Sequence, residues 1–146
     1  MSSQYVYVTY IRTTADRLWE ALISPEFNKQ YWFGMHQESE WKPGAPWKLV
    51  FEDGRVADAG EVVEIDRPRR LVLKWRNEFK PELKAEGFSR CVMELQSEGE
   101  TVKLTITHSI EKDDAKIIHA VSGGWPKILS SLKSLLETGS PLPRSA

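Results

Sequence analysis

The C-terminal part of the sequence carries the strongest amphipathic pattern of the chain. From Trp125 through Leu136, apolar residues recur at steps of three and four, which is the spacing of one face of an α-helix. Residues 113–121 show the same stripe, and Gly139 supplies the left-handed conformation that commonly ends a helix. A long helix with one apolar face has to bury that face, so the rest of the chain must provide a second layer.

The preceding segments provide this layer, because their apolar residues alternate with polar ones as in half-buried β-strands. The alternation is clearest in residues 101–110, where Val102, His108 and Ile110 belong to the face that is otherwise apolar. Such an element is typical of an antiparallel sheet with one solvated face. The predicted strands span residues 5–12, 47–52, 56–65, 70–77, 88–96 and 101–110, and a polar loop spans residues 77–87.

Two short helices are predicted between the first strand and the remaining ones, at residues 13–24 and 24–33. Gly60 lies inside a strand and indicates a bulge or a sharp bend. Asp113 or Asp114 can cap the start of the C-terminal helical region.

This order predicts an α+β fold with a curved antiparallel sheet of about six to seven strands. Two short helices follow the first strand, and the long C-terminal helix packs across the sheet. One domain is expected over residues 1–139, followed by a frayed tail over residues 140–146, where Pro141 and Pro143 end the helical pattern. If the sheet is strongly curved, helix and sheet need not touch everywhere, and a cavity can open between them.

Composition excludes several classes of partner. The 146 residues carry a formal net charge of −1, so the balance of charge does not point to nucleic acid or an anionic membrane as a partner. No apolar run approaches the ~20 residues of a membrane span, and no signal-peptide pattern begins the sequence. The single cysteine, Cys91, excludes an internal disulfide. We therefore expect a cytoplasmic protein without a nucleic-acid or membrane partner, either monomeric or homodimeric.

The sequence also lacks the usual signatures of catalysis. The three histidines and Cys91 show no metal-ligand spacing, and there is neither a G-x-S-x-G nucleophile motif nor a phosphate-binding loop. We expect no cofactor, no metal, no catalytic residue, and no hydrolase or ATPase activity. An enzyme of the cyclase or hydrolase kind, with His108 as acid or base, remains open, but it would need a second titratable group.

Aromatic residues are the strongest functional signal. Six tryptophans are many for this length, and large aromatic side chains are the usual lining of small-molecule pockets. For each of these aromatic residues, packing in the core is the competing interpretation. For His108, the favoured interpretation is a hydrogen-bonded histidine in the core. The predicted ligand-binding residues are Trp32, Phe33, Trp47, Trp75, Phe88, Met93, His108 and Trp125.

An unusual stretch, GGWP, interrupts the helical pattern. We interpret Gly123 and Gly124 as a place where the helix passes close to another backbone or over the cavity mouth. Pro126 cannot donate a backbone hydrogen bond, so the helix is expected to bend or restart there, with Ser122 as a cap. Trp125 would then cover one end of the cavity. The alternative is a simple helix boundary with Trp125 in the core.

Several stretches and their order resemble the START-type helix-grip superfamily (SRPBCC), and within it the branch named after the activator of heat-shock protein 90 ATPase. The stretches are RTTADRLWEALISPE (residues 12–26), PGAPWKL (43–49), GEVVEIDRPRRLVLKW (60–75), TVKLTITHS (101–109) and GGWPKILSSLKSLLETG (123–139).

The resemblance implies the helix-grip fold, which hosts lipid carriers, binders of hydroxylated aromatics, cyclases and co-chaperone modules. Three functions follow as hypotheses: a binding module for a small apolar or aromatic ligand, with His108 or a hydroxyl as the polar anchor; the enzyme described above; or a co-chaperone-type module with a protein partner. The first requires only a cavity of suitable shape and apolar lining.

Overall fold

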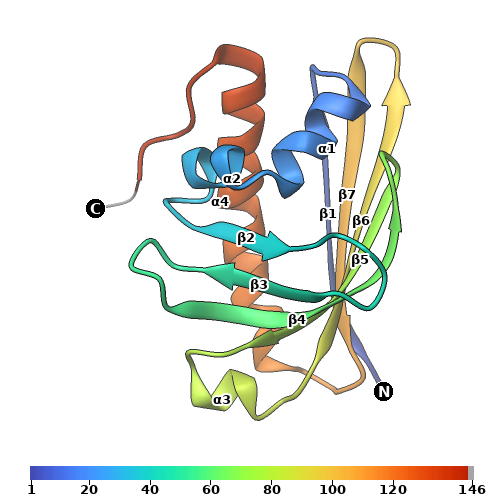
Figure 1. Cartoon of the computed structure of the whole chain (residues 1–146). Helices are drawn as coiled ribbons and strands as arrows, with labels where there is room; N and C mark the ends of the chain where they lie inside the picture. The colour runs from blue at the N-terminus through green and yellow to red at the C-terminus, as the bar shows by residue number, and fades with distance from the viewer. Residues whose placement is uncertain (145–146) are drawn as a thin grey trace.

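A seven-stranded sheet curves around one long helix in the computed structural model, which describes residues 1–144 (Figure 1). The predicted α+β helix-grip architecture is confirmed. The elements in chain order are β1 (Ser3–Ile11), α1 (Ala15–Ile23), α2 (Pro25–Tyr31), β2 (His36–Ser39), β3 (Pro46–Val50), β4 (Val56–Asp66), β5 (Arg70–Asn77), α3 (Pro81–Lys84), β6 (Ser89–Glu98), β7 (Thr101–Ile110) and α4 (Lys116–Thr138).

The sheet has the strand order β1-β7-β6-β5-β4-β3-β2, and each neighbouring pair is antiparallel. The connection through α1 and α2 leads the chain from one edge of the sheet to the other. The chain then returns strand by strand and places β7 beside β1. In Figure 1, β2, β3 and β4 cross in front of α4, whereas β1 runs along it.

The core lies between the concave face of the sheet and the helices. β7 follows the predicted alternation, since Val102, Leu104, Ile106, His108 and Ile110 are all buried. The helix α1 buries the apolar face that its sequence predicts, and its N-cap Thr14 accepts a hydrogen bond from the backbone N–H of Arg17 at 3.2 Å.

Bulges bend the sheet at the strands that cover α4. The pairing of β4 with β5 shifts between Val62 and Glu64, and that of β3 with β4 shifts between Leu49 and Val50. Bulges of this kind increase the local twist of a strand. Gly60 lies just before the first of them, where an added Cβ would come within 1.7 Å of the Lys74 carbonyl oxygen. The glycine is therefore required by the close approach of β5.

Two predictions about local structure are wrong. The loop predicted at residues 77–87 contains the short helix α3, and α4 is one continuous helix through Pro126, which contradicts the predicted restart, whereas the alternative of a bend stays a prediction. Ser122 does not cap a second segment, because its hydroxyl donates to the His119 carbonyl at 2.7 Å. Strand β2 was not predicted, since its sequence, HQES, carries no apolar alternation.

The start of α4 is stabilised from a distant part of the chain. Its N-cap is Ala115, which offers no side-chain cap, so neither predicted aspartate caps the helix. The Glu86 carboxylate instead accepts hydrogen bonds from the backbone N–H groups of Lys116 and Ile117, both at 2.8 Å. An acidic group at this end also favours the helix dipole.

The predicted tail, residues 140–146, is described only as far as residue 144; residues 145 and 146 lie outside the described part. Residues 140–144 form neither helix nor strand. The Leu142 backbone N–H donates to the Ser131 hydroxyl at 3.2 Å, and the Arg144 guanidinium pairs with the Glu52 carboxylate at 3.0 Å.

Replacing Gly60 with alanine is expected to lower the free energy of unfolding by about 2 kcal/mol or more, because the new methyl group overlaps backbone of β5. Gly123→Ala is the matched control. Its Cβ meets no atom within 4 Å, and alanine favours the helix by about 0.5–1 kcal/mol. Urea denaturation of both variants measures the difference. Equal stability of the two variants would contradict the close approach at Gly60.

Candidate ligand-binding pocket

A pocket of about 250 Å³ lies between α4 and the curved part of the sheet. Its walls come from the segment after α2, from strands β3 to β5, from the loop after β5 and from α4. Most of the lining is apolar, which is the usual character of small-molecule sites. The aromatic side chains of the lining are Trp32, Phe51, Trp75, Phe79 and Trp125.

Three of the predicted tryptophans, Trp32, Trp75 and Trp125, meet at this pocket. The ring centroid of Trp125 lies 5.7 Å from that of Trp32 and 5.7 Å from that of Trp75. Phe51 and Phe79 add an edge-to-face pair with centroids 5.0 Å apart. These spacings are those of attractive aromatic contacts, so the rings hold one another in place around the pocket.

Four of the other predicted residues lie away from the pocket. Trp47 is fully buried behind Trp75, with ring centroids 4.5 Å apart, and Met93 is buried in the core. Phe33 has a left-handed backbone at the end of α2 and borders a separate surface depression. Phe88 precedes β6 and is 44% exposed, and the Arg76 guanidinium lies 4.6 Å from its ring centroid. Strand alternation alone could not distinguish these positions.

His108, the predicted polar anchor, is fully buried and does not line the pocket. The Trp125 indole N–H donates to its Nδ1 at 3.3 Å. In a neutral ring the proton then resides on Nε2, which donates to the Ser89 hydroxyl at 2.8 Å. That hydroxyl donates to the Trp75 carbonyl at 2.9 Å. Burial lowers the pKa of His108 to about 4, so the ring stays neutral. These are the contacts of a hydrogen-bonded core histidine, which is the interpretation of His108 that the sequence favours.

The polar groups that do line the pocket are Asp58 and Asn77, neither of which was predicted from the sequence. They are register partners on β4 and β5. Alternation along β5 continues its inward face from Leu73 and Trp75 to Asn77, and the strand pairing then brings Asp58 opposite. This alternation was the signal that could have found them.

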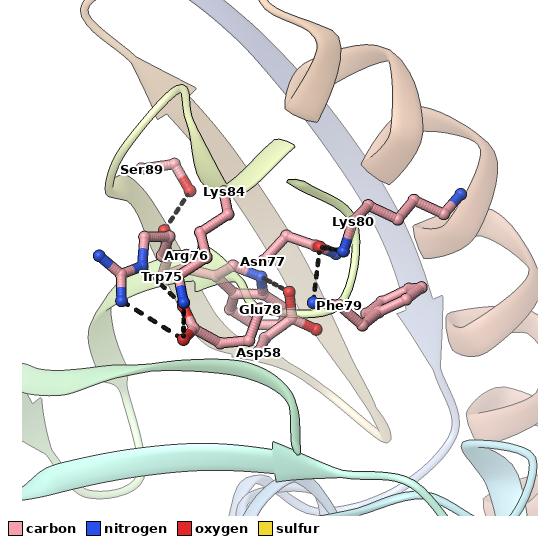
Figure 2. A network of polar contacts seen from close by, with 9 residues as sticks. All are labelled: Asp58, Trp75, Arg76, Asn77, Glu78, Phe79, Lys80, Lys84 and Ser89. Atoms are coloured by element: carbon pink, nitrogen blue, oxygen red, sulfur yellow. Dashed lines mark hydrogen bonds and ion pairs between the residues drawn. The ribbon is translucent and has the colours of Figure 1, made fainter. Parts of the chain in front are cut away.

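Asp58 is only 7% exposed, and the Trp75 indole N–H donates to its Oδ1 at 3.0 Å (Figure 2). The pKa of Asp58 is raised to about 7, chiefly by burial and in addition by the negative charge of Glu78, although hydrogen bonds from Trp75 and Asn77 act in the opposite direction. Glu78 itself is paired with Arg76 at 2.6 Å and with Lys84 at 3.3 Å.

Asn77 positions the loop that closes this side of the pocket. Its Oδ1 accepts hydrogen bonds from the backbone N–H groups of Phe79 and Lys80, at 3.2 and 2.9 Å. This turn directs the Phe79 ring toward α4, as Figure 2 shows. Asn77 therefore links the polar wall to one of the aromatic walls.

Asp58 is the only acidic or basic side chain among the described residues that line the pocket. Within residues 1–144, no group of three His, Cys, Asp or Glu side chains could hold a metal ion. Burial raises the pKa of the Cys91 thiol, which keeps it protonated and unreactive. In the described part of the chain, no helix has the length and apolar character needed to span a membrane.

The two buried groups are expected to give stability opposite dependences on pH. Asp58 has a folded-state pKa of about 7 against an ordinary 3.8, so its stabilising contribution is complete below about pH 4 and is lost as the pH rises to 7. His108 has a pKa of about 4 against 6.5, so its contribution is complete above pH 6.5 and is lost as the pH falls to 4.

Between pH 4 and 6.5 these two contributions oppose each other in the wild-type protein. Asp58→Asn leaves only that of His108, and the free energy of unfolding of this variant is expected to rise relative to the wild type by up to about 1.4 kcal/mol per pH unit. Urea denaturation at several pH values measures the slope. A variant whose pH profile matches that of the wild type would contradict the assigned shift of Asp58.

Comparison with known proteins gives one family and one fold. The family model described as activator of Hsp90 ATPase homolog 1-like protein matches residues 12–137. No curated protein sequence matches the chain.

Among solved structures, protein MLL2253 from Mesorhizobium loti aligns with a TM-score of 0.78 and 19% identity, over 92% of this chain and 97% of that one. The Aha1 dimer from Colwellia psychrerythraea aligns at 0.75 and 15%, over 94% and 98%. PFC0360w, an HSP90 activator from Plasmodium falciparum, aligns at 0.74 and 20%, over 91% and 95%. These likenesses show the shared fold. Because the family model covers most of the sequence, the chain belongs to the activator of Hsp90 ATPase homolog 1-like family.

Proposed function

We propose that the protein is a binding module that takes a small apolar or aromatic molecule into the pocket between α4 and the sheet. The observation that carries this proposal is a cavity with aromatic walls and a single buried carboxyl group at its edge. A volume of about 250 Å³ suits a molecule the size of a substituted benzene.

The two adjacent glycines of α4 differ in a way that supports this role. Gly124 lines the pocket, and an added Cβ would meet only Ile128, at 4.0 Å. Gly123 is exposed, and its Cβ would meet nothing within 4 Å. Neither glycine is needed for a close backbone approach, which leaves the cavity-mouth interpretation for Gly124 alone. A side chain at Gly124 would extend into space that a ligand would occupy.

The polar anchor of this proposal is Asp58 with Asn77, in place of His108. Both ring nitrogens of His108 are hydrogen-bonded, one to Trp125 and the other to Ser89, so neither is free to bind a ligand. An acid–base enzyme is less well supported, because general acid–base chemistry commonly uses two converging groups and this pocket offers one.

Butylbenzene is expected to bind the protein with a dissociation constant on the order of ten micromolar, about −7 kcal/mol, and to change the tryptophan fluorescence excited at a wavelength that the ligand does not absorb. Gly124→Leu fills the pocket and should abolish the change. Gly123→Leu places the same side chain one residue away, on the exposed face, and should preserve it. If both variants bind as the wild type does, or if the wild type binds nothing, the proposed pocket is not a binding site.

A second candidate is a protein-binding role like that of the HSP90 activator among the structural neighbours. The observation that favours it is an apolar stripe on the outer face of β1, where Val6, Val8 and Tyr10 are each 43–48% exposed. Edge strands with exposed apolar faces commonly serve as contact sites.

In this case, an Hsp90 chaperone would bind the protein in a calorimetric titration, and Val8→Lys would weaken binding at least tenfold. Gln96→Lys adds the same charge at an exposed position on β6, which β7 separates from β1, and is the control for the change of charge alone. An unchanged affinity in Val8→Lys, or no binding by the wild type, would exclude this role for the stripe.

A further inference from the structure

We infer that the pocket selects organic ammonium ions, whose charged nitrogen binds the Asp58 carboxylate and whose apolar part lies against the tryptophans. This inference rests on the proposed binding function and names the ligand class for the same pocket.

The charges around the pocket favour a cationic ligand. Within residues 1–144, Asp58 makes no salt bridge, and no lysine, arginine or histidine lines the pocket. The charge that acts on Asp58 is that of Glu78, which is also negative and whose cationic partners, Arg76 and Lys84, are paired with it. A buried carboxylate without a cation is costly to a protein, and a cationic ligand would supply the missing partner.

The hydrogen bonds of Asp58 leave room for such a ligand. One indole N–H reaches Oδ1, and the Asn77 side chain faces the carboxyl group from the neighbouring strand. An ionised carboxylate has about four acceptor positions, so these two neighbours do not exhaust it. Since Asp58 lines the pocket, the remaining positions are available to a donor inside it.

The aromatic walls also favour a positively charged ligand. Trp32, Trp75 and Trp125 surround the cavity, with the rings of Trp32 and Trp75 each 5.7 Å from that of Trp125. Ring faces carry negative electrostatic potential, and tryptophan is the strongest cation–π partner among the side chains. Carboxylate and rings thus attract an ammonium group, and both disfavour an anion.

The protonation state of Asp58 separates this inference from its main rival. A protonated Asp58 would instead donate to a neutral carbonyl ligand. Because burial places the pKa of Asp58 at about 7, ammonium binding is expected to tighten as the pH rises from 5.5 to 8, and carbonyl binding to weaken. Other groups do not obscure the trend: the pKa of Glu78 is lowered by Arg76, His108 is neutral behind the tryptophans, and α4 presents no titratable side chain to the pocket.

The test compares two ligands of nearly equal shape, 3-phenylpropylamine and butylbenzene, by calorimetry at pH 8. The amine is expected to bind the wild type at least tenfold more tightly. In Asp58→Asn the amine should bind no more tightly than butylbenzene, because its charge then has no partner in the pocket. Asp113→Asn, an exposed aspartate before α4, is the control and should retain the wild-type ratio. If Asp58→Asn does not fold, the affinity of the wild type for the amine is measured from pH 5.5 to 8 instead. A rise in affinity with pH supports the inference, and a fall contradicts it.

The outcomes separate this inference from the function on which it rests. If butylbenzene binds and the amine gains nothing, or if Asp58→Asn keeps the wild-type ratio, the ammonium inference is wrong and the binding function stands. If 4-phenyl-2-butanone binds more tightly than the amine and weakens as the pH rises, Asp58 acts as a donor and the inference is overturned. If none of the three ligands binds, both proposals fail.

Discussion

The hydrogen-bond chain from Trp125 through His108 and Ser89 to the Trp75 carbonyl links α4 to the middle of the sheet. Each donor in it has one acceptor, and the buried ring remains neutral because ionisation would require a desolvated charge. This hydrogen-bond network holds Trp125 against Trp75, and both rings line the pocket. The shape of the cavity therefore depends on a contact that lies outside it.

Burial affects the two titratable groups near this wall in different ways. His108 has partners for both ring nitrogens and is enclosed, which makes it part of the scaffold. Asp58 has comparable burial but borders open space, so its desolvation is compensated only in part. The distinction between a structural polar group and a site rests on access to the cavity, because both groups have strongly shifted pKa values.

Sequence patterns predicted the fold because alternation and helical spacing report local burial. They predicted three of the pocket tryptophans for the same reason. They could not exclude Trp47 or Phe88, since position behind another ring or beyond a strand end is set by three-dimensional packing. Asp58 required the register of β4 against β5. The helix continues through Pro126 because the packing of Trp125 and its neighbours outweighs the lost backbone hydrogen bond.

The loop after β5 has two separate tasks. It carries Phe79 into the pocket wall, and it carries Glu86 to the first turn of α4, which has no cap of its own. For protein engineering, this means that the loop is a poor site for altering ligand preference by insertion or exchange. A change in the length of the loop would displace Phe79 from the pocket wall and also remove Glu86 from the start of α4. A new ligand specificity would therefore require a redesigned helix cap.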